Sequence, residues 1–101
     1  MIELFSHREG GSQVFSLKGR LEFGDFTESS QVLEAFDSAS IERVVIDLKD
    51  LEFMDSAGVG LLIGLNKTAV EKGKPMALRG ATGAVKELVE LFQLGTVFEI
   101  Q

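Results

Sequence analysis

The chain has 101 residues, 45% of them apolar, and a formal net charge of −6. This length predicts one domain, residues 1–101, with a core large enough for the chain to fold without disulfides or a structural metal ion. Cysteine is absent and there is a single histidine, His7. The composition excludes disulfides, thiolate metal sites and a cysteine nucleophile, and leaves little material for a histidine-based metal site or a Ser-His hydrolase.

The negative net charge argues against direct binding to nucleic acid, which requires a basic surface. The longest apolar run, residues 59–65, is far shorter than the roughly 20 residues that span a bilayer. Residues 1–4 lack the basic and apolar regions of a signal peptide. We therefore expect a cytoplasmic protein without membrane contact, acting on another protein or a small ligand.

The first half of the chain predicts a hairpin followed by a helix. Residues 2–6 and 13–17 alternate as strands do, and the glycines between them supply a turn. Residues 25–38 predict a helix that Asp25 or Thr27 could cap. The residues expected to share one face of this helix are Phe26, Val32, Leu33 and Phe36.

The second half predicts alternating strands and helices. Residues 43–48 form an apolar run typical of a strand buried on both faces. A helix is expected from Ser56 to about Lys72, then a strand at 76–79, a helix at 82–93 and a strand at 96–100. The apolar face of that later helix would be Val85, Leu88, Val89 and Phe92. The predicted fold is α/β, with the order ββαβαβαβ and a mixed sheet against which the helices pack.

The junction at residues 55–58, Asp-Ser-Ala-Gly, is the most informative site. Ser56 follows an apolar strand and opens an apolar helix, where unpaired N–H groups and the helix dipole favour negative charge. A serine there can cap the helix, act as a nucleophile or accept a phosphate.

Familiar catalytic and cofactor motifs do not fit this junction. A nucleophile elbow requires G-x-S-x-G, but Met54 stands where the first glycine should be. Gly58, Gly60 and Gly64 have one residue too many for the dinucleotide fingerprint, and they lie inside the helical run. We interpret these three glycines as residues that allow the helix to pack closely on the sheet.

From Gly19 to Ile100 the chain resembles the STAS-domain anti-sigma factor antagonists (anti-anti-sigma factors). The resemblance rests on Gly19-Arg20-Leu21, on the strand at 44–48, and above all on Leu51-Glu52-Phe53-Met54-Asp55-Ser56-Ala57-Gly58-Val59-Gly60. Further matches are Ala84-Val85-Lys86-Glu87-Leu88 and Leu94-Gly95-Thr96-Val97-Phe98.

The resemblance implies a phosphorylation switch and not an enzyme. Ser56 would be phosphorylated by a partner that is both an anti-sigma factor and a serine kinase. The unphosphorylated antagonist would bind this partner and free its client, and a separate serine phosphatase would reset the cycle. ATP and Mg²⁺ would belong to the kinase, so this chain would hold no cofactor or metal.

The partner-binding residues expected from the resemblance and the local sequence surround Ser56: Glu22, Met54, Asp55, Ala57, Gly58, Val59 and Leu61. Asp55 is either a helix cap or a partner contact, and one residue can be both. Ala57 stands where the family often has a hydroxyl, which leaves Ser56 as the one hydroxyl of the turn. Glu22 stands where the family often has Asp, and a solvated loop carboxylate is its alternative reading.

The helix after Ser56 should pack Val59, Leu62 and Ile63 against the sheet. That arrangement would leave Leu61 and Leu65 beside Met54 near the surface, as an apolar rim for a partner. The alternative is that neighbouring helices cover these residues, which is the commoner arrangement. On phosphorylation, attraction to the helix dipole and repulsion from Asp55 would oppose each other. Little internal rearrangement is therefore expected, and the switch should act at the interface.

Two departures from the family concern the C-terminal part. Thr82-Gly83 replaces a proline-containing helix entry, and Thr82 can cap that helix. The chain ends at Gln101, where many relatives continue into another helix, so this C-terminal helix is expected to be absent and apolar surface to be exposed.

Two other functions remain open at this point. One is a non-phosphorylated STAS interaction subunit of a transport or signalling assembly. The other, less favoured by the acidic charge, is a sensor of a small ligand or nucleotide.

Overall fold

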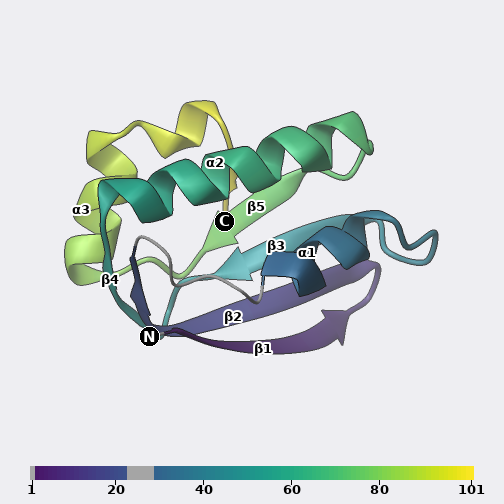
Figure 1. The fold of residues 1–101 in the computed structure, drawn as a ribbon, viewed down its shortest axis with the longest axis horizontal. Coiled ribbons are helices and arrows are strands. Elements are labelled where there is room, and N and C mark those ends of the chain that lie inside the picture. The colour runs from purple at the N-terminus through teal and green to yellow at the C-terminus, as the bar shows by residue number, and fades with distance from the viewer. Residues whose placement is uncertain (1, 23–28) are drawn as a thin grey trace.

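A mixed six-stranded sheet runs through the molecule in the computed structural model, which describes residues 2–22 and 29–101 (Figure 1). The strands are β1 (Ile2–Glu9), β2 (Ser12–Leu21), β3 (Arg43–Asp47), β4 (Leu51–Met54), β5 (Met76–Arg79) and β6 (Glu99–Ile100). Their order in space is β1-β2-β3-β5-β6, and β4 pairs with β2. Only β1 and β2 are antiparallel among these pairs, so the predicted mixed sheet is confirmed.

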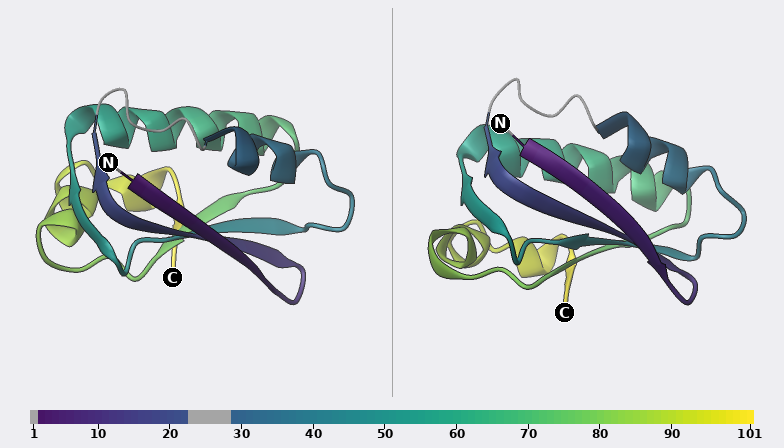
Figure 2. Two further views of the ribbon diagram at one scale, coloured as in Figure 1. Left: turned by 60° about the horizontal axis from the view of Figure 1, so that its bottom comes forward. Right: turned by 90° about the horizontal axis from the view of Figure 1, so that it is seen from below.

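Helices α1 (Ser29–Phe36) and α2 (Ser56–Glu71) lie side by side on one face of the sheet (Figures 1 and 2). Helix α3 (Gly83–Leu91) packs against β4, at the end of the molecule where α2 begins. A short 3₁₀ turn, η1 (Leu94–Thr96), leads from α3 into β6. The first turn of α2 and the whole of α3 thus share one end of the molecule.

The observed order, ββαββαβαβ, contains one strand more than predicted. The additional strand is β4, which lies directly before Ser56 and pairs in parallel with the end of β2. Strand β2 pairs with β3 through residues 12–16 and with β4 from Gly19 onward. The register with β4 shifts after Gly19, whose φ of +105° is available to glycine at little cost. The kink at Gly19 therefore brings the end of β2 beside the residues that precede Ser56.

Most predicted elements are confirmed, with changes at their ends. The hairpin forms, and its strands extend to Glu9 and Leu21. The last strand is shorter than predicted, since residues 94–96 form η1 and only residues 99–100 pair with β5. The predicted cap at Asp25 or Thr27 and the position of Phe26 lie outside the described residues.

The main core fills the space between the sheet and the helices. Val44, Val45 and Ile46 of β3 are all buried, which confirms the strand predicted to be covered on both faces. On the opposite face, Val45 joins Val14 and Ala77 in a small second cluster. One face of β3 thus belongs to the main core and the other to this smaller cluster.

For two helices, the residues at the centre of the predicted apolar face are buried as expected, whereas a residue at its edge is exposed. In α1, Val32 and Phe36 are buried but Leu33 is exposed. In α3, Val85 and Val89 are buried, whereas the side chain of Phe92, just beyond the helix, is 44% exposed. Helical spacing identifies the side of a helix that packs, and the neighbouring elements decide how wide the buried stripe is.

Candidate functional site

The turn that carries Ser56 is held by Asp55, which is the N-cap of α2. Its extended backbone ends β4, and its carboxylate Oδ1 accepts a hydrogen bond of 2.8 Å from the amide of Gly58. The Asp55 amide donates to the carbonyl of Leu21 at 3.3 Å. The expected capping role of Asp55 is confirmed, and the same residue fastens the turn to the end of β2.

Gly58 allows α2 to begin directly against β2. A Cβ at this position would lie 2.6 Å from the carbonyl oxygen of Leu21 and 3.0 Å from Cγ of Met54. Such a contact is much shorter than van der Waals distance, so a larger residue would push the first turn away from the sheet. The predicted close packing is confirmed for Gly58.

Gly60 and Gly64 do not share that role. Among residues 2–22 and 29–101, a Cβ added to either residue would meet no atom within 4 Å, apart from neighbouring atoms of the helix itself. Both residues are on the exposed side of α2. The prediction of close helix-to-sheet packing is therefore wrong for these two glycines.

Ser56 is the first residue of α2 and is exposed, as is Ala57 beside it. Within residues 2–22 and 29–101 its hydroxyl makes no hydrogen bond, since Asp55 provides the cap in its place. An exposed hydroxyl at a helix N-terminus is accessible to another protein, and the nearby amides favour negative charge at that position.

The apolar residues around Ser56 differ from the prediction. Met54 is 1% exposed and Leu65 is 6% exposed, so these two residues are covered and do not form an exposed rim. Met54, predicted as a partner contact, is therefore buried. Conversely, Ile63 was expected against the sheet and is 39% exposed. Leu65 faces the core, and Asn66 and Ala69 in the later turns of α2 share this buried side of the helix.

The other predicted partner residues divide into two groups. Gly58 and Val59 are buried beneath the turn, while Leu61 is half-buried. Asp55, Ala57 and Glu22 reach the surface, the first and last being partly covered. Met54, Gly58 and Val59 therefore hold the turn in place, and the accessible part of the predicted site is smaller than the full set.

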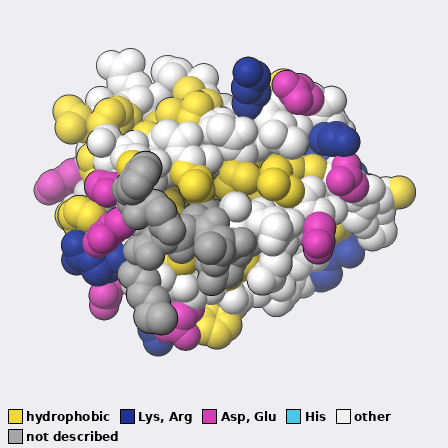
Figure 3. Space-filling view, viewed as in Figure 1, with side chains coloured by type: hydrophobic (Ala, Val, Ile, Leu, Met, Phe, Trp, Pro, Cys, Tyr) yellow, Lys and Arg dark blue, Asp and Glu magenta, His cyan; other side chains and the backbone are white. Residues whose placement is uncertain are grey.

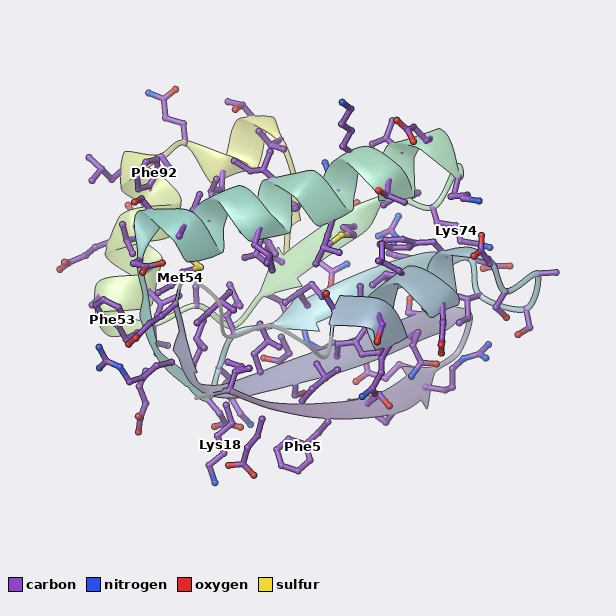
Figure 4. All side chains as sticks on the ribbon, viewed as in Figure 1. Phe5, Lys18, Phe53, Met54, Lys74 and Phe92 are labelled. Atoms are coloured by element: carbon purple, nitrogen blue, oxygen red, sulfur yellow. The ribbon has the colours of Figure 1, made fainter. Side chains whose placement is uncertain are left out.

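Beside the turn, Arg20 and Phe53 form a pair that the sequence reasoning missed. They are register partners on β2 and β4, and Cζ of Arg20 lies 4.2 Å from the centre of the Phe53 ring. The guanidinium also forms an ion pair with Glu22. Figure 4 shows Phe53 and Met54 at the end of the molecule where α2 begins. Glu22 is thus not a free loop carboxylate, and its predicted partner contact would compete with Arg20.

Catalytic and metal chemistry find little support among the described residues. His7 lies on β1 with Nε2 2.7 Å from Glu9, where it pairs with a carboxylate and not with Ser56. Residues 2–22 and 29–101 contain no group of three metal-ligating side chains. None of the helices described for these residues is both long and apolar enough to cross a membrane.

Comparisons with known proteins agree with this geometry. The family model described as "Mlab, STAS domain" matches residues 5–100. An anti-sigma F factor antagonist from Paenibacillus polymyxa is 33% identical over 101 residues, which cover 98% of this chain and 84% of the relative. The chain belongs to the STAS-domain family of anti-sigma factor antagonists.

Solved structures of antagonists have the same fold. An anti-sigma factor antagonist from Mycobacterium paratuberculosis has a TM-score of 0.81 at 21% identity, with 99% of this chain and 85% of that chain covered. The unphosphorylated form of the antagonist SpoIIAA has a TM-score of 0.73 at 20% identity, covering 100% and 87%. SpoIIAA in its phosphorylated form gives 0.68 at 19% identity, covering 100% and 91%.

Proposed function

We propose that this STAS domain is an anti-sigma factor antagonist whose binding is switched off by phosphorylation of Ser56. Unphosphorylated, it binds an anti-sigma factor and releases the client of that factor. The observation that carries the proposal is the exposed Ser56 hydroxyl on a turn held from below by Asp55 and Gly58. Membership of the antagonist family supports this function over that of a transporter subunit.

The partner would be an anti-sigma factor that is also a serine kinase, and a serine phosphatase would restore the binding form. ATP and Mg²⁺ would be held by the kinase. The chain itself acts as a substrate and binding module, with Asp55, Ala57, Leu61 and Glu22 as the accessible contacts around Ser56.

Phosphorylation should change the surface more than the fold. A phosphoserine adds about −1.5 to −2 charges at neutral pH. The helix N-terminus attracts this charge by roughly 0.3–1 kcal/mol, and the carboxylate of Asp55 repels it. Because Ser56 is exposed, the phosphate stays hydrated in the free protein. In a complex it would be buried without compensation, at a cost of several kcal/mol, and each 1.4 kcal/mol lowers affinity about tenfold.

The test is to incubate the purified chain with each candidate anti-sigma kinase and MgATP, then to measure intact mass and binding. We expect one added phosphoryl group, no uptake by Ser56→Ala, and a loss of affinity of about 100-fold or more, the equivalent of several kcal/mol. Ser30→Ala is the matched control, because Ser30 is likewise an exposed serine in the first turn of a helix.

Two results would contradict the proposal. One is phosphate uptake that persists in Ser56→Ala and disappears in Ser30→Ala. The other is binding of equal strength before and after Ser56 is phosphorylated, which would favour a non-phosphorylated interaction subunit.

A further inference from the structure

Strand β1 forms an open edge of the sheet. It pairs with β2 over all eight of its residues, and among residues 2–22 and 29–101 no strand pairs with its other side. The right-hand view of Figure 2, from below, shows β1 in front of β2. A strand with a free edge carries a row of unpaired N–H and C=O groups, to which another chain can add.

The geometry of the hairpin determines which backbone groups point to the open edge. The two-residue turn Gly10-Gly11 joins Glu9 and Ser12, and turns of this length close on a hydrogen-bonded pair. Along an antiparallel ladder, such pairs alternate with pairs whose backbone groups point away from each other. The residues that direct N–H and C=O groups to the open edge are therefore Ile2, Leu4, Ser6 and Arg8.

The centre of β1 lacks the features that keep sheet edges from joining. Natural edge strands are short, or they carry proline, a bulge or charged side chains. β1 has eight residues, contains no proline and keeps one register with β2 throughout. Residues 4–6 are uncharged, and the side chain of Phe5 in their middle is 54% exposed. The open edge therefore has an apolar centre at which a second strand can pair.

The ring of Phe5 lies on the face of the sheet that α1 and α2 leave uncovered. His7, two residues further along β1, is the register partner of Val14, which belongs to the small cluster on that face. The register partner of Phe5 is Ser16, which is too small to cover an aromatic ring. Figure 3 shows a hydrophobic side chain protruding at the lower margin of the molecule, where Figure 4 labels Phe5.

The charges of β1 favour antiparallel pairing with a second copy of the same strand. When Phe5 lies opposite Phe5 of the second copy, Glu3 of each copy lies opposite His7 of the other, so that a carboxylate meets an imidazole. Moving the register by one pair toward the turn would place Glu3 opposite Glu9, and a parallel arrangement would place each charge beside its own copy. Like charges directly opposite each other are destabilising, so the register through Phe5 is favoured.

The other face of β1 has space for the same register. A groove of about 320 Å³ lies beside Ser6, between the β1–β2 hairpin and α1, and its apolar lining is Phe15, Ala35 and Ile41. In the register through Phe5, Leu4 of the second copy lies opposite Ser6 and on the same face. Its side chain would therefore point toward this groove.

We propose that the open edge of β1 is a dimerisation site, at which two copies of this chain join their sheets antiparallel with Phe5 opposite Phe5. Backbone hydrogen bonds hold the two strands together, and the paired rings and Leu4 supply the apolar contact. Gly19 of β2 pairs with Ile2 on one side and with Leu51 of β4 on the other. Because β2 thus separates the open edge from β4, both Ser56 turns stay exposed in the dimer.

The first test measures the mass of the full chain by sedimentation equilibrium. One strand pair covers less than the roughly 800 Å² per partner of a standard interface, so we expect a weak dimer with a Kd of about 10–100 μM. Phe5→Lys places two ammonium groups opposite each other and should raise this Kd about tenfold or more. Val70→Lys is the matched control, because Val70 is an apolar residue of α2 that is 64% exposed, and it should dimerise as the wild type does. Equal melting temperatures in dilute solution would show that both variants fold.

The second test measures the register, since the chain has no cysteine of its own. In Phe5→Cys the two facing Cα atoms would lie about 4.5 Å apart, which a disulfide can bridge. In the matched control Glu3→Cys, on the same face of the same strand, they would lie about 14 Å apart. With oxidised glutathione we expect Phe5→Cys to form a linked dimer and Glu3→Cys to stay monomeric.

The proposal is overturned if the wild type is still a monomer at about 500 μM, well above the expected Kd. It is also overturned if Phe5→Lys dimerises as the wild type does, or if Glu3→Cys is linked as readily as Phe5→Cys. Protection of the β1 amides from hydrogen exchange in a complex with an anti-sigma factor, without dimerisation of the free chain, would assign the edge to a partner strand instead. The phosphorylation of Ser56 is measured separately, so none of these results decides the proposed function.

Discussion

The two ends of α2 use their polar groups in opposite ways. At the first end, Asp55 closes the cap alone, and the Ser56 hydroxyl has no bond to any residue in the described ranges 2–22 and 29–101. At the last end, Gly73 and Lys74 donate their amides back to Val70 and Ala69, which closes the helix in a Schellman motif.

The last end also fastens the neighbouring helix. The ammonium of Lys74 donates to the carbonyls of Phe36 at 2.9 Å and of Ser38 at 2.5 Å, at the end of α1, and Figure 4 shows this side chain at the end of the molecule opposite Phe53. Lys72 adds an ion pair with Asp37. One end of α2 therefore fastens the fold, and at the other end the Ser56 hydroxyl is exposed above buried residues. Substitutions at the two ends should separate stability from binding.

The largest effect on stability is expected at Gly58. In Gly58→Ala the new methyl group would meet the Leu21 carbonyl, a backbone group that cannot turn aside. We expect a loss of about 3 kcal/mol, the upper part of the range for overpacking, measured by urea denaturation. Gly60→Ala is the matched control and should gain about 0.5–1 kcal/mol. Equal effects at the two positions would contradict the distinction between them.

Lys74→Met should cost about 2 kcal/mol, because two partly buried carbonyls at the end of α1 lose a charged donor. The methionine keeps the unbranched stem, so the change mainly reports the ammonium group. Binding and phosphorylation should be unaffected once the protein is folded. If Lys74→Met instead slowed the modification of Ser56, the two ends of α2 would not be independent.

Asp55→Ala should lower stability by about 1 kcal/mol through loss of the cap. Asp55→Asn retains an oxygen acceptor and should recover most of that stability. The pair of variants also tests the second role expected of Asp55. A contact that needs the charge predicts weak binding by both variants, whereas a pure cap predicts that Asp55→Asn binds as the wild type does.

The smallest effect on stability is expected when the pH is lowered. It involves Glu9, which lies on the face of the sheet opposite α1 and α2. Glu9 accepts two hydrogen bonds of 2.9 Å from Arg79 and a further contact from His7, and these partners lower the pKa of Glu9 from 4.5 to about 2. A carboxylate with a lowered pKa in the folded state contributes stability above pH 4.5 that is lost as the pH falls toward 2.

In Glu9→Gln the melting temperature should therefore decrease less than in the wild type between about pH 4.5 and pH 2. Phosphorylation of Ser56 should change little. The matched control is Glu3→Gln on the same strand, where the charge is exposed. If both variants reduced the pH dependence of the melting temperature equally, net charge and not the pairing with Arg79 would determine stability in acid.

Local sequence patterns were sufficient for much of the fold. Apolar periodicity and the glycine turns located the hairpin, β3, α2 and β5 to within a few residues. β4 was missed because it follows β3 after only residues 48–50, and its identity as a separate strand depends on pairing with the distant end of β2. Residues 96–98 were predicted as strand but lie in η1 and the turn after it, because a backbone hydrogen bond of 2.8 Å from the amide of Phe98 to the carbonyl of Leu94 brings these two buried residues together.

The serine and the capping aspartate of the candidate site could be predicted from the sequence, but the exposure of the apolar residues around them could not. A small hydroxyl residue between an apolar strand and an apolar helix is a local pattern, and so is an aspartate three residues before the amide that it caps. Which apolar residues lie near that hydroxyl is not local. Met54 and Leu65 are buried in the main core, while Ile63 and Phe92 are exposed because none of the elements described for residues 2–22 and 29–101 covers them.

The sequence by itself therefore determined the order of most elements, the position of Ser56 at the start of a helix, and Asp55 as a candidate cap, since these depend on local patterns. The tertiary structure decided the rest. It distinguished Gly58, where an added Cβ would clash with the Leu21 carbonyl, from Gly60, where it would meet no described atom outside the helix. It also placed the exposed residues of α3 at the same end of the molecule as Ser56 (Figure 2). Both results depend on contacts between residues far apart in the chain, which no local pattern encodes.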